Sequence, residues 1–112
     1  MKRIAPIFPV HDLAASIRHY QLLGFTVREY EGVYGLANRD GVEIHLGTLA
    51  DQNSESAKHS AYLWVDDSDA LAQEWQAVGA EVHIPEDTDW GQHEGAMVDP
   101  DGNVIRFGSP ID

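Results

Sequence analysis

Three short segments of the chain alternate apolar and polar side chains with the period of two that is typical of a half-buried β-strand. The side chains in the non-apolar phase of these segments are Glu43, His45, Ser60, Tyr62, Trp64, Val104 and Arg106. An imidazole and a guanidinium can serve as a general base and an oxyanion holder, and aromatic rings can hold flat or cationic groups. The alternation therefore predicts a polar and aromatic face that binds a ligand.

The opposite phase of the same segments is apolar and needs helices to cover it. Ile44 and Leu46 in one segment, and Ile105 and Phe107 in another, are expected to pack against helices. Trp75 lies at helical spacing within the second helical segment and is expected in the core. A sheet with helices on one side and the polar face on the other describes a cup that accepts a ligand.

The elements that position these residues occur twice. Two groups of residues recur at fixed offsets: Val10, Asp12, Tyr20, Gly24 and Val27 match Val65, Asp67, Trp75, Gly79 and Val82, and Asp40, Gly41, Ile44, Leu46 and Gly47 match Asp101, Gly102, Ile105, Phe107 and Gly108. The first offset is 55 and the second is 61, so the second copy gains six residues. They predict an extra loop or bulge between Val82 and Asp101, in the stretch that contains Trp90.

Each copy reads as a strand, a helix and three further strands. In the first copy Asp12 can cap the helix and Gly24 can end it. The strands are expected at residues 4–10, 25–31, 34–38 and 42–49, and then at 60–65, 81–84, 95–98 and 103–108, with a long loop before 95. The polar stretch after the first copy indicates a linker. We therefore expect a module at 1–50, a linker at 51–59 and a module at 60–112.

Composition excludes several classes of protein. The 112 residues include no cysteine, which excludes a disulfide framework and a thiolate site. No apolar run approaches the ~18 residues that a membrane span requires, so we expect a soluble, cytoplasmic protein without a membrane partner. A formal charge of -12 repels phosphate backbones and attracts small cations, so nucleic acid is not an expected partner.

Two βαβββ copies with the turn "DPDGN" before the last strand resemble the vicinal oxygen chelate superfamily, which includes glyoxalases, extradiol dioxygenases and bleomycin resistance proteins. The stretches "VHDLAASIRHYQLLGF" and "DPDGNVIRF" carry the resemblance. It implies an α+β fold in which two βαβββ modules form a cup-shaped mixed sheet with helices on the outer face. It also implies a homodimer, and Pro6, inside the expected first strand, suits a strand exchanged between chains.

The resemblance also locates the positions where related enzymes hold a metal. Carried onto this chain they are Ala5, His45, Ser60 and Arg106. A divalent ion ~4 Å from the Arg106 guanidinium would meet roughly 8 kcal/mol of repulsion at an effective dielectric of 20. One imidazole cannot offset that cost, so we expect neither a metal nor another cofactor.

Within the superfamily the chain is most similar to bleomycin resistance proteins, with which it shares "AYLWV", a helix ending in "EW", "WG" in the second copy and "RDGV". This similarity implies a flat ring clamped at Tyr34, Tyr62 and Trp90. The expected ligand-binding residues are Tyr34, His45, Ser60, Tyr62, Trp64, Trp90 and Arg106. The implied function is metal-independent sequestration of a cationic, flat-ringed antibiotic of the bleomycin or phleomycin type.

Two other functions remain open at this point. One is a glyoxalase-like lyase or isomerase with His45 as general base and Arg106 as oxyanion holder. The other is a carrier domain for a different aromatic metabolite. Arg106 can also form a structural ion pair with Glu43 or Glu94.

Overall fold

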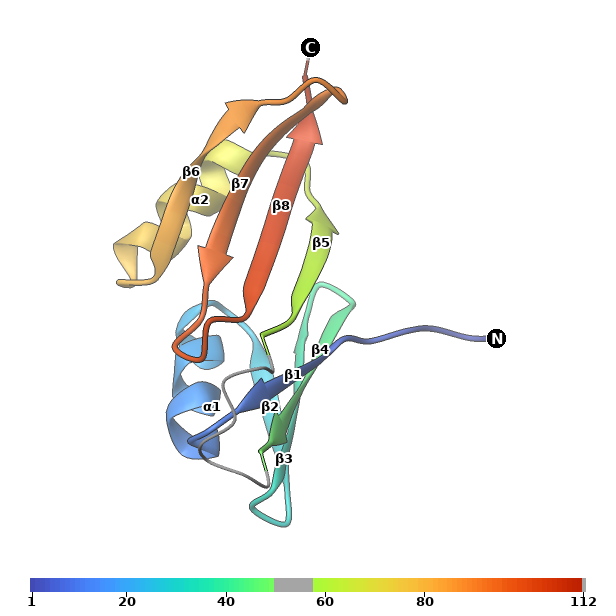
Figure 1. Cartoon of the computed structure of the whole chain (residues 1–112), viewed down its shortest axis with the longest axis vertical. Coiled ribbons are helices and arrows are strands. Elements are labelled where there is room, and N and C mark those ends of the chain that lie inside the picture. The colour runs from blue at the N-terminus through green and yellow to red at the C-terminus, as the bar shows by residue number, and fades with distance from the viewer. Residues whose placement is uncertain (50–57, 112) are drawn as a thin grey trace.

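The computed structural model describes residues 1–49 and 58–111 (Figure 1). Its elements are β1 (Ile7–Val10), α1 (Leu13–Leu22), β2 (Thr26–Tyr30), β3 (Tyr34–Arg39), β4 (Val42–Thr48), β5 (Ser60–Trp64), α2 (Ser68–Ala77), β6 (Glu81–Asp87), β7 (Gln92–Val98) and β8 (Val104–Pro110). The order βαβββ, repeated twice, is the one that the sequence predicts. Of the predicted linker at 51–59, residues 51–57 lie outside the described ranges.

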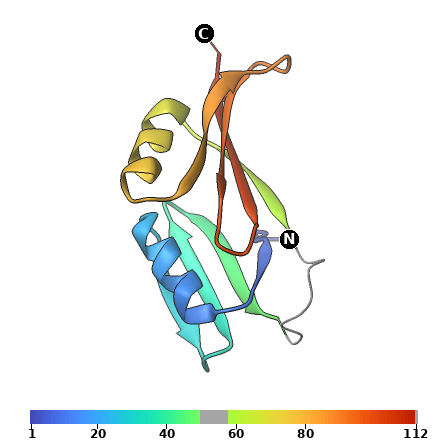
Figure 2. The same cartoon turned by 60° about the vertical axis from the view of Figure 1, so that its left-hand side comes forward.

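The strands form two four-stranded mixed sheets, one in each module, ordered β1-β4-β3-β2 and β5-β8-β7-β6. The first strand of each module is parallel to its last strand, and the other neighbours are antiparallel. Both helices lie on the same side of the molecule (Figure 2), which leaves the opposite face of each sheet uncovered. We call this uncovered face the cup face. The α+β fold class is confirmed.

Both helices begin and end as their sequences predict. The Asp12 and Asp67 side chains accept hydrogen bonds from the backbone N–H groups of Ala15, at 3.1 Å, and Ala70, at 3.0 Å. Such caps supply acceptors to the N–H groups that the first helical turn leaves unpaired. A glycine at positive φ follows each helix, Gly24 at 92° and Gly79 at 89°. Other residues adopt this backbone conformation only at a cost in free energy.

One hydrophobic core joins the two modules. The strand residues assigned to the helix-facing phase, Ile44, Leu46, Ile105 and Phe107, are buried, which confirms the alternation. Trp75 is 1% exposed, and its indole N–H donates to the Leu23 carbonyl in the other module at 3.1 Å. The prediction of a core tryptophan is therefore confirmed.

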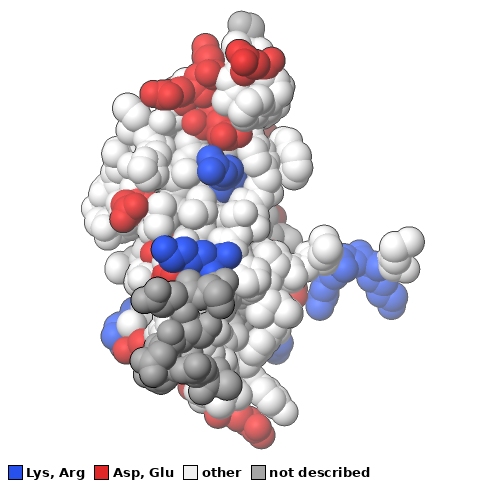
Figure 3. Space-filling model, in the orientation of Figure 1, with Lys and Arg blue, Asp and Glu red and all other residues white. Residues whose placement is uncertain are grey.

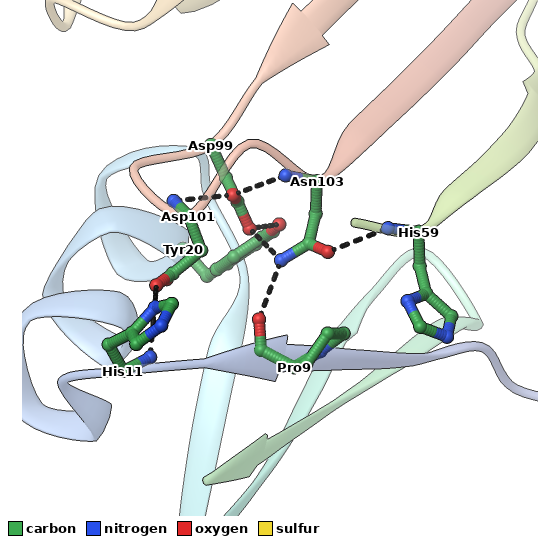
Figure 4. A network of polar contacts seen from close by, with 7 residues as sticks. All are labelled: Pro9, His11, Tyr20, His59, Asp99, Asp101 and Asn103. Atoms are coloured by element: carbon green, nitrogen blue, oxygen red, sulfur yellow. Dashed lines mark hydrogen bonds and ion pairs between the residues drawn. The ribbon is translucent and has the colours of Figure 1, made fainter. Parts of the chain in front are cut away.

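The turn "DPDGN" also fastens the modules together (Figure 4). The buried Asp99 carboxylate accepts from the Tyr20 hydroxyl of the first module at 2.9 Å. The Asn103 amide donates to the Pro9 carbonyl at 2.9 Å and to Asp99 at 3.0 Å. These bonds satisfy polar groups that burial would otherwise penalise. The motif thus fixes the relative placement of the modules.

The extra residues of the second copy form a longer hairpin, so the prediction of a long loop before residue 95 is wrong. β6 continues to Asp87 and β7 begins at Gln92, while a register shift between His83 and Glu86 provides the predicted bulge. The turn closes where the Thr88 hydroxyl donates to the Gln92 carbonyl at 2.8 Å. The sequence predicts these two strands at 81–84 and 95–98 but not their extension towards the turn, because the polar side chains of the added residues show no clean alternation.

The prediction that Pro6 lies inside the first strand is also wrong. β1 begins at Ile7, and Pro6 precedes it, with its carbonyl accepting from the His45 N–H at 2.9 Å. The strand contains Pro9 instead and lies at the edge of its sheet, where a missing N–H costs little. Residues 1–6 extend away from the body as an arm (Figure 1). Within one chain β1 pairs with its own β4, so strand exchange stays a prediction.

Candidate ligand-binding site

Four of the predicted site residues come together on or beside the cup face of the second module. The register places Trp64 of β5 opposite Gly108 of β8, and Gly108 opposite Glu94 of β7. Two residues earlier on β5 and β8, Tyr62 lies opposite Arg106. Side chains of neighbouring strands at matched positions stand on the same face within reach of one another. The β-ladders therefore assemble this site from three strands.

The aromatic part of the site is open to solvent. The Tyr62 and Trp64 rings lie 4.8 Å apart between centroids, with their planes tilted by 53°. Trp64 is 72% exposed, and Trp90, in the turn of the β6–β7 hairpin, is 66% exposed. Large aromatic rings normally bury most of their area, and exposed rings that adjoin one another, as Tyr62 and Trp64 do, are typical of interaction sites. These two indoles are thus available for stacking.

The Tyr62 hydroxyl links the aromatic and polar parts of the site. Burial raises the pKa of Tyr62, and the Glu94 carboxylate raises it further, whereas Trp90 and Arg106 act in the opposite direction. The strand register agrees, since Arg106 lies opposite Tyr62, and Glu94 lies opposite Gly108, next to which the Tyr62 hydroxyl sits. The predicted clamp residues Tyr62 and Trp90 are brought together.

A loose ion pair lies in the middle of the cup face. Arg106 Nη1 is 3.8 Å from Glu94 Oε2. The Arg106 side chain is 57% exposed whereas that of Glu94 is 12% exposed, so water screens only one partner well. Of the two structural partners considered for Arg106, the structure selects Glu94. The guanidinium remains accessible to a ligand.

A groove of about 540 Å³ runs along this face. Its lining is His83, Ile84, Glu86, Asp87, Thr88, Glu94, Gly95, Ala96, Val98, Val104 and Arg106. Three carboxylates face one guanidinium there, so the groove favours cations. Figure 3 shows acidic side chains gathered over the same end of the molecule.

His93 attaches the turn end of the β6–β7 hairpin to helix α2. Its Nδ1 lies 2.8 Å from Asp87 and its Nε2 lies 2.9 Å from Asp69. The hydrogen bonds to these two carboxylates raise the pKa of His93. This bridge holds the strands that carry Trp90 against the rest of the module.

The predicted residues Tyr34 and His45 lie on the cup face of the other sheet. The Tyr34 hydroxyl donates to His45 Nδ1 at 2.8 Å, and His45 Nε2 donates to Glu43 at 2.7 Å, because a carboxylate only accepts. Arg3 from the arm lies 3.7 Å from Glu43. Both nitrogens of the imidazole are thus occupied within the chain.

Ser60 begins β5 opposite Val104 and is exposed. It lies on the cup face, two residues before Tyr62, but no polar contact ties it to the aromatic cluster within the described residues.

Of the four positions compared with metal ligands, Ala5 lies in the arm before β1. The described ranges contain no group of three or more histidine or carboxylate side chains arranged to hold a metal ion.

Sequence reasoning missed Gln92 as a residue of this site. It lies on β7, two residues before Glu94, and so on the same face. The spacing of two between Gln92 and Glu94 could have placed both side chains on one face of a strand. A loop was expected before residue 95, however, so this spacing was not read as part of a strand.

Comparisons with known proteins identify the family. Residues 3–107 match the family described as the Glyoxalase/Bleomycin resistance protein/Dioxygenase superfamily. The chain belongs to this superfamily. Among its members, a bleomycin resistance protein of Geobacillus stearothermophilus is 28% identical over 127 residues, covering 96% of this chain and 96% of the relative. The predicted resemblance is confirmed.

Solved structures of the superfamily share the fold. A bleomycin resistance determinant encoded on the transposon Tn5 superposes with a TM-score of 0.87 at 22% identity, covering 98% of each chain. A bleomycin-binding protein complexed with bleomycin gives a TM-score of 0.85 at 21% identity, covering 99% of this chain and 100% of the other.

Among the described residues no helix is long and apolar enough to cross a membrane.

Proposed function

We propose that this protein binds and sequesters a cationic, flat-ringed antibiotic of the bleomycin or phleomycin type without altering it. The observation that carries the proposal is that the exposed indoles of Trp64 and Trp90 lie on the same module as a groove with an excess of carboxylates, and that Arg106, which lines this groove, lies opposite Tyr62. Aromatic faces bind flat rings, and both the rings and the carboxylates attract cations. The relatives named as bleomycin resistance proteins support the same ligand class.

The arrangement of His45 and Arg106 favours binding over catalysis. A general base needs a free nitrogen within hydrogen-bond reach of the substrate, whereas both nitrogens of His45 have partners. Arg106 lies on the sheet of the other module, with Glu94 as its partner. The two groups named for a lyase or isomerase thus lie on different sheets of one chain. A second copy can bring them into one cup, so it is the occupied nitrogens of His45 that favour binding over catalysis.

The working unit is proposed to be a cytoplasmic homodimer. Tyr34 and His45 form half of the predicted lining on one sheet, and the aromatic cluster forms the other half on the second sheet. A second copy can bring opposite halves together to complete two cups. The exposed arm, in which Met1 and Ile4 leave apolar side chains in water, is the segment available for exchange. Light scattering at micromolar concentration tests this assembly, and a monomer would contradict it.

The test of function combines calorimetry with mass spectrometry. Bleomycin or phleomycin should bind the purified protein, quench tryptophan fluorescence and be recovered with unchanged mass. An altered mass after incubation would support the enzymatic alternative. Failure of both drugs to bind below ~100 μM at low salt would refute the antibiotic proposal, since even 100 μM corresponds to only ~5.5 kcal/mol of binding free energy.

A further inference from the structure

Two polar atoms at the cup face of the second module are buried without hydrogen-bond partners. They are Tyr62 Oη and Gln92 Oε1; Glu94 and Trp90 border the Tyr62 hydroxyl, but neither reaches full hydrogen-bond geometry with it. Both lie above the same backbone position, because a Cβ added at Gly108 would collide with Tyr62 Oη and approach Gln92 Oε1 to 3.2 Å. Because Gly108 has no side chain, both atoms can lie over its backbone. Buried polar atoms without partners are uncommon and call for an explanation.

The neighbours of this space are hydrogen-bond acceptors. Gln92 and Glu94 project from β7 on the same face, and Glu94 lies directly opposite Gly108 across the ladder. An amide oxygen and a carboxylate only accept, while the Tyr62 hydroxyl can accept or donate. The group that satisfies all three side chains therefore carries several donors.

Arg106 does not supply those donors. Its nearest approach to Glu94 is 3.8 Å, beyond ordinary hydrogen-bond length, and its side chain is largely exposed. Tyr62 Oη and Gln92 Oε1 remain unpaired with Arg106 in this position. A positively charged donor from outside the chain would meet Glu94 in a partly buried setting, where a charge-assisted hydrogen bond is strong.

We propose that Tyr62, Gln92 and Glu94, grouped over Gly108, form a subsite for a cationic group that carries N–H bonds, either a guanidinium or a primary ammonium. This inference rests on the proposed function and adds to it the place that receives the charged end of the ligand. Trp90 lies beside the Tyr62 hydroxyl, so the indole available for stacking also borders this subsite. The flat part and the charged end of one ligand would thus bind next to each other.

Two forms of bleomycin that carry the same tail charge provide the test. One form has a guanidinium tail, and the other has a dimethylsulfonium tail, which has no N–H bond. Calorimetry should give a dissociation constant about tenfold lower for the guanidinium form. In Gln92→Leu and in Tyr62→Phe the ratio should fall towards one, chiefly because the guanidinium form weakens. Gln21→Leu, an exposed change on α1, is the matched control and should keep the ratio.

The outcomes separate the two proposals. Equal binding of both forms to the unmodified protein, or a preference that survives in both variants, would overturn the subsite and leave the proposed function intact. Binding of neither form would overturn the proposed function and the subsite with it. The comparison of tails in the unmodified protein decides the matter even if one variant fails to fold, and thermal unfolding of each variant identifies that case.

Discussion

Replacing Trp90 with alanine isolates the contribution of stacking to ligand binding. Trp90 lies in the turn of the β6–β7 hairpin and contributes little to the core, since 66% of it is exposed. The change should therefore leave the free energy of unfolding nearly constant. Any loss of affinity then reports contact with the ligand rather than loss of fold.

The size of the loss follows from the exposed area. A tryptophan side chain presents ~200 Å² of surface that it can bury, of which roughly two thirds is free here. A flat ring that covers one face removes about half of that free area, or ~65 Å², worth ~1.6 kcal/mol at ~25 cal/mol per Å². Favourable ring geometry adds ~0.5 to 1.5 kcal/mol. We expect a total of about 2 to 3 kcal/mol, a rise in the dissociation constant of roughly 30- to 150-fold.

Calorimetric titration of bleomycin into the variant at 50 mM and at 500 mM salt is the assay. The loss should be similar at both concentrations, because apolar burial and stacking are little screened. Leu22→Ala serves as the control, since Leu22 is a large apolar residue of α1 that is 59% exposed and lies on the helix side of the molecule, away from the cup face. An unchanged dissociation constant for the Trp90 variant would show that the clamp lies elsewhere, even if the protein binds the drug.

Three further outcomes are expected. Affinity of the unmodified protein for bleomycin should fall between 50 mM and 500 mM salt, as the Debye length shrinks from ~14 Å to ~4 Å; calorimetry showing no change would exclude long-range attraction by the carboxylates. Tyr20→Phe should lower the free energy of unfolding by about 1 to 3 kcal/mol, since Asp99 loses one buried donor, and urea denaturation that shows full stability would contradict this role. Because Asp69 and Asp87 raise the pKa of His93, its ion pairs should stabilise the protein fully below pH ~6.5 and be lost as pH rises through the raised value. His93→Gln should flatten that dependence in thermal unfolding measured from pH 5 to 9, and an unaltered pH profile would refute the assignment.

Local sequence determined the elements and the face on which most side chains lie. The period of two in β4 and β8 put Ile44 and Phe107 in the core and His45 and Arg106 on the cup face, because successive strand residues point to opposite sides. The residues that recur at fixed offsets predicted two βαβββ modules, because like sequences form like elements. Each element carries its own pattern, so no long-range contact was needed to recognise it.

Tertiary structure decided which side chains meet. The β6–β7 hairpin forms although its residues lack clean alternation, since pairing with β8 and the His93 bridge stabilise strands that local preference does not specify. Tyr62, Gln92 and Gly108 lie on three different strands, and no spacing along the chain reveals that their atoms lie close together. That the two modules form separate sheets, with Tyr34 on one and Tyr62 on the other, was equally hidden, because a pattern in the sequence shows the face of a strand and not its neighbours.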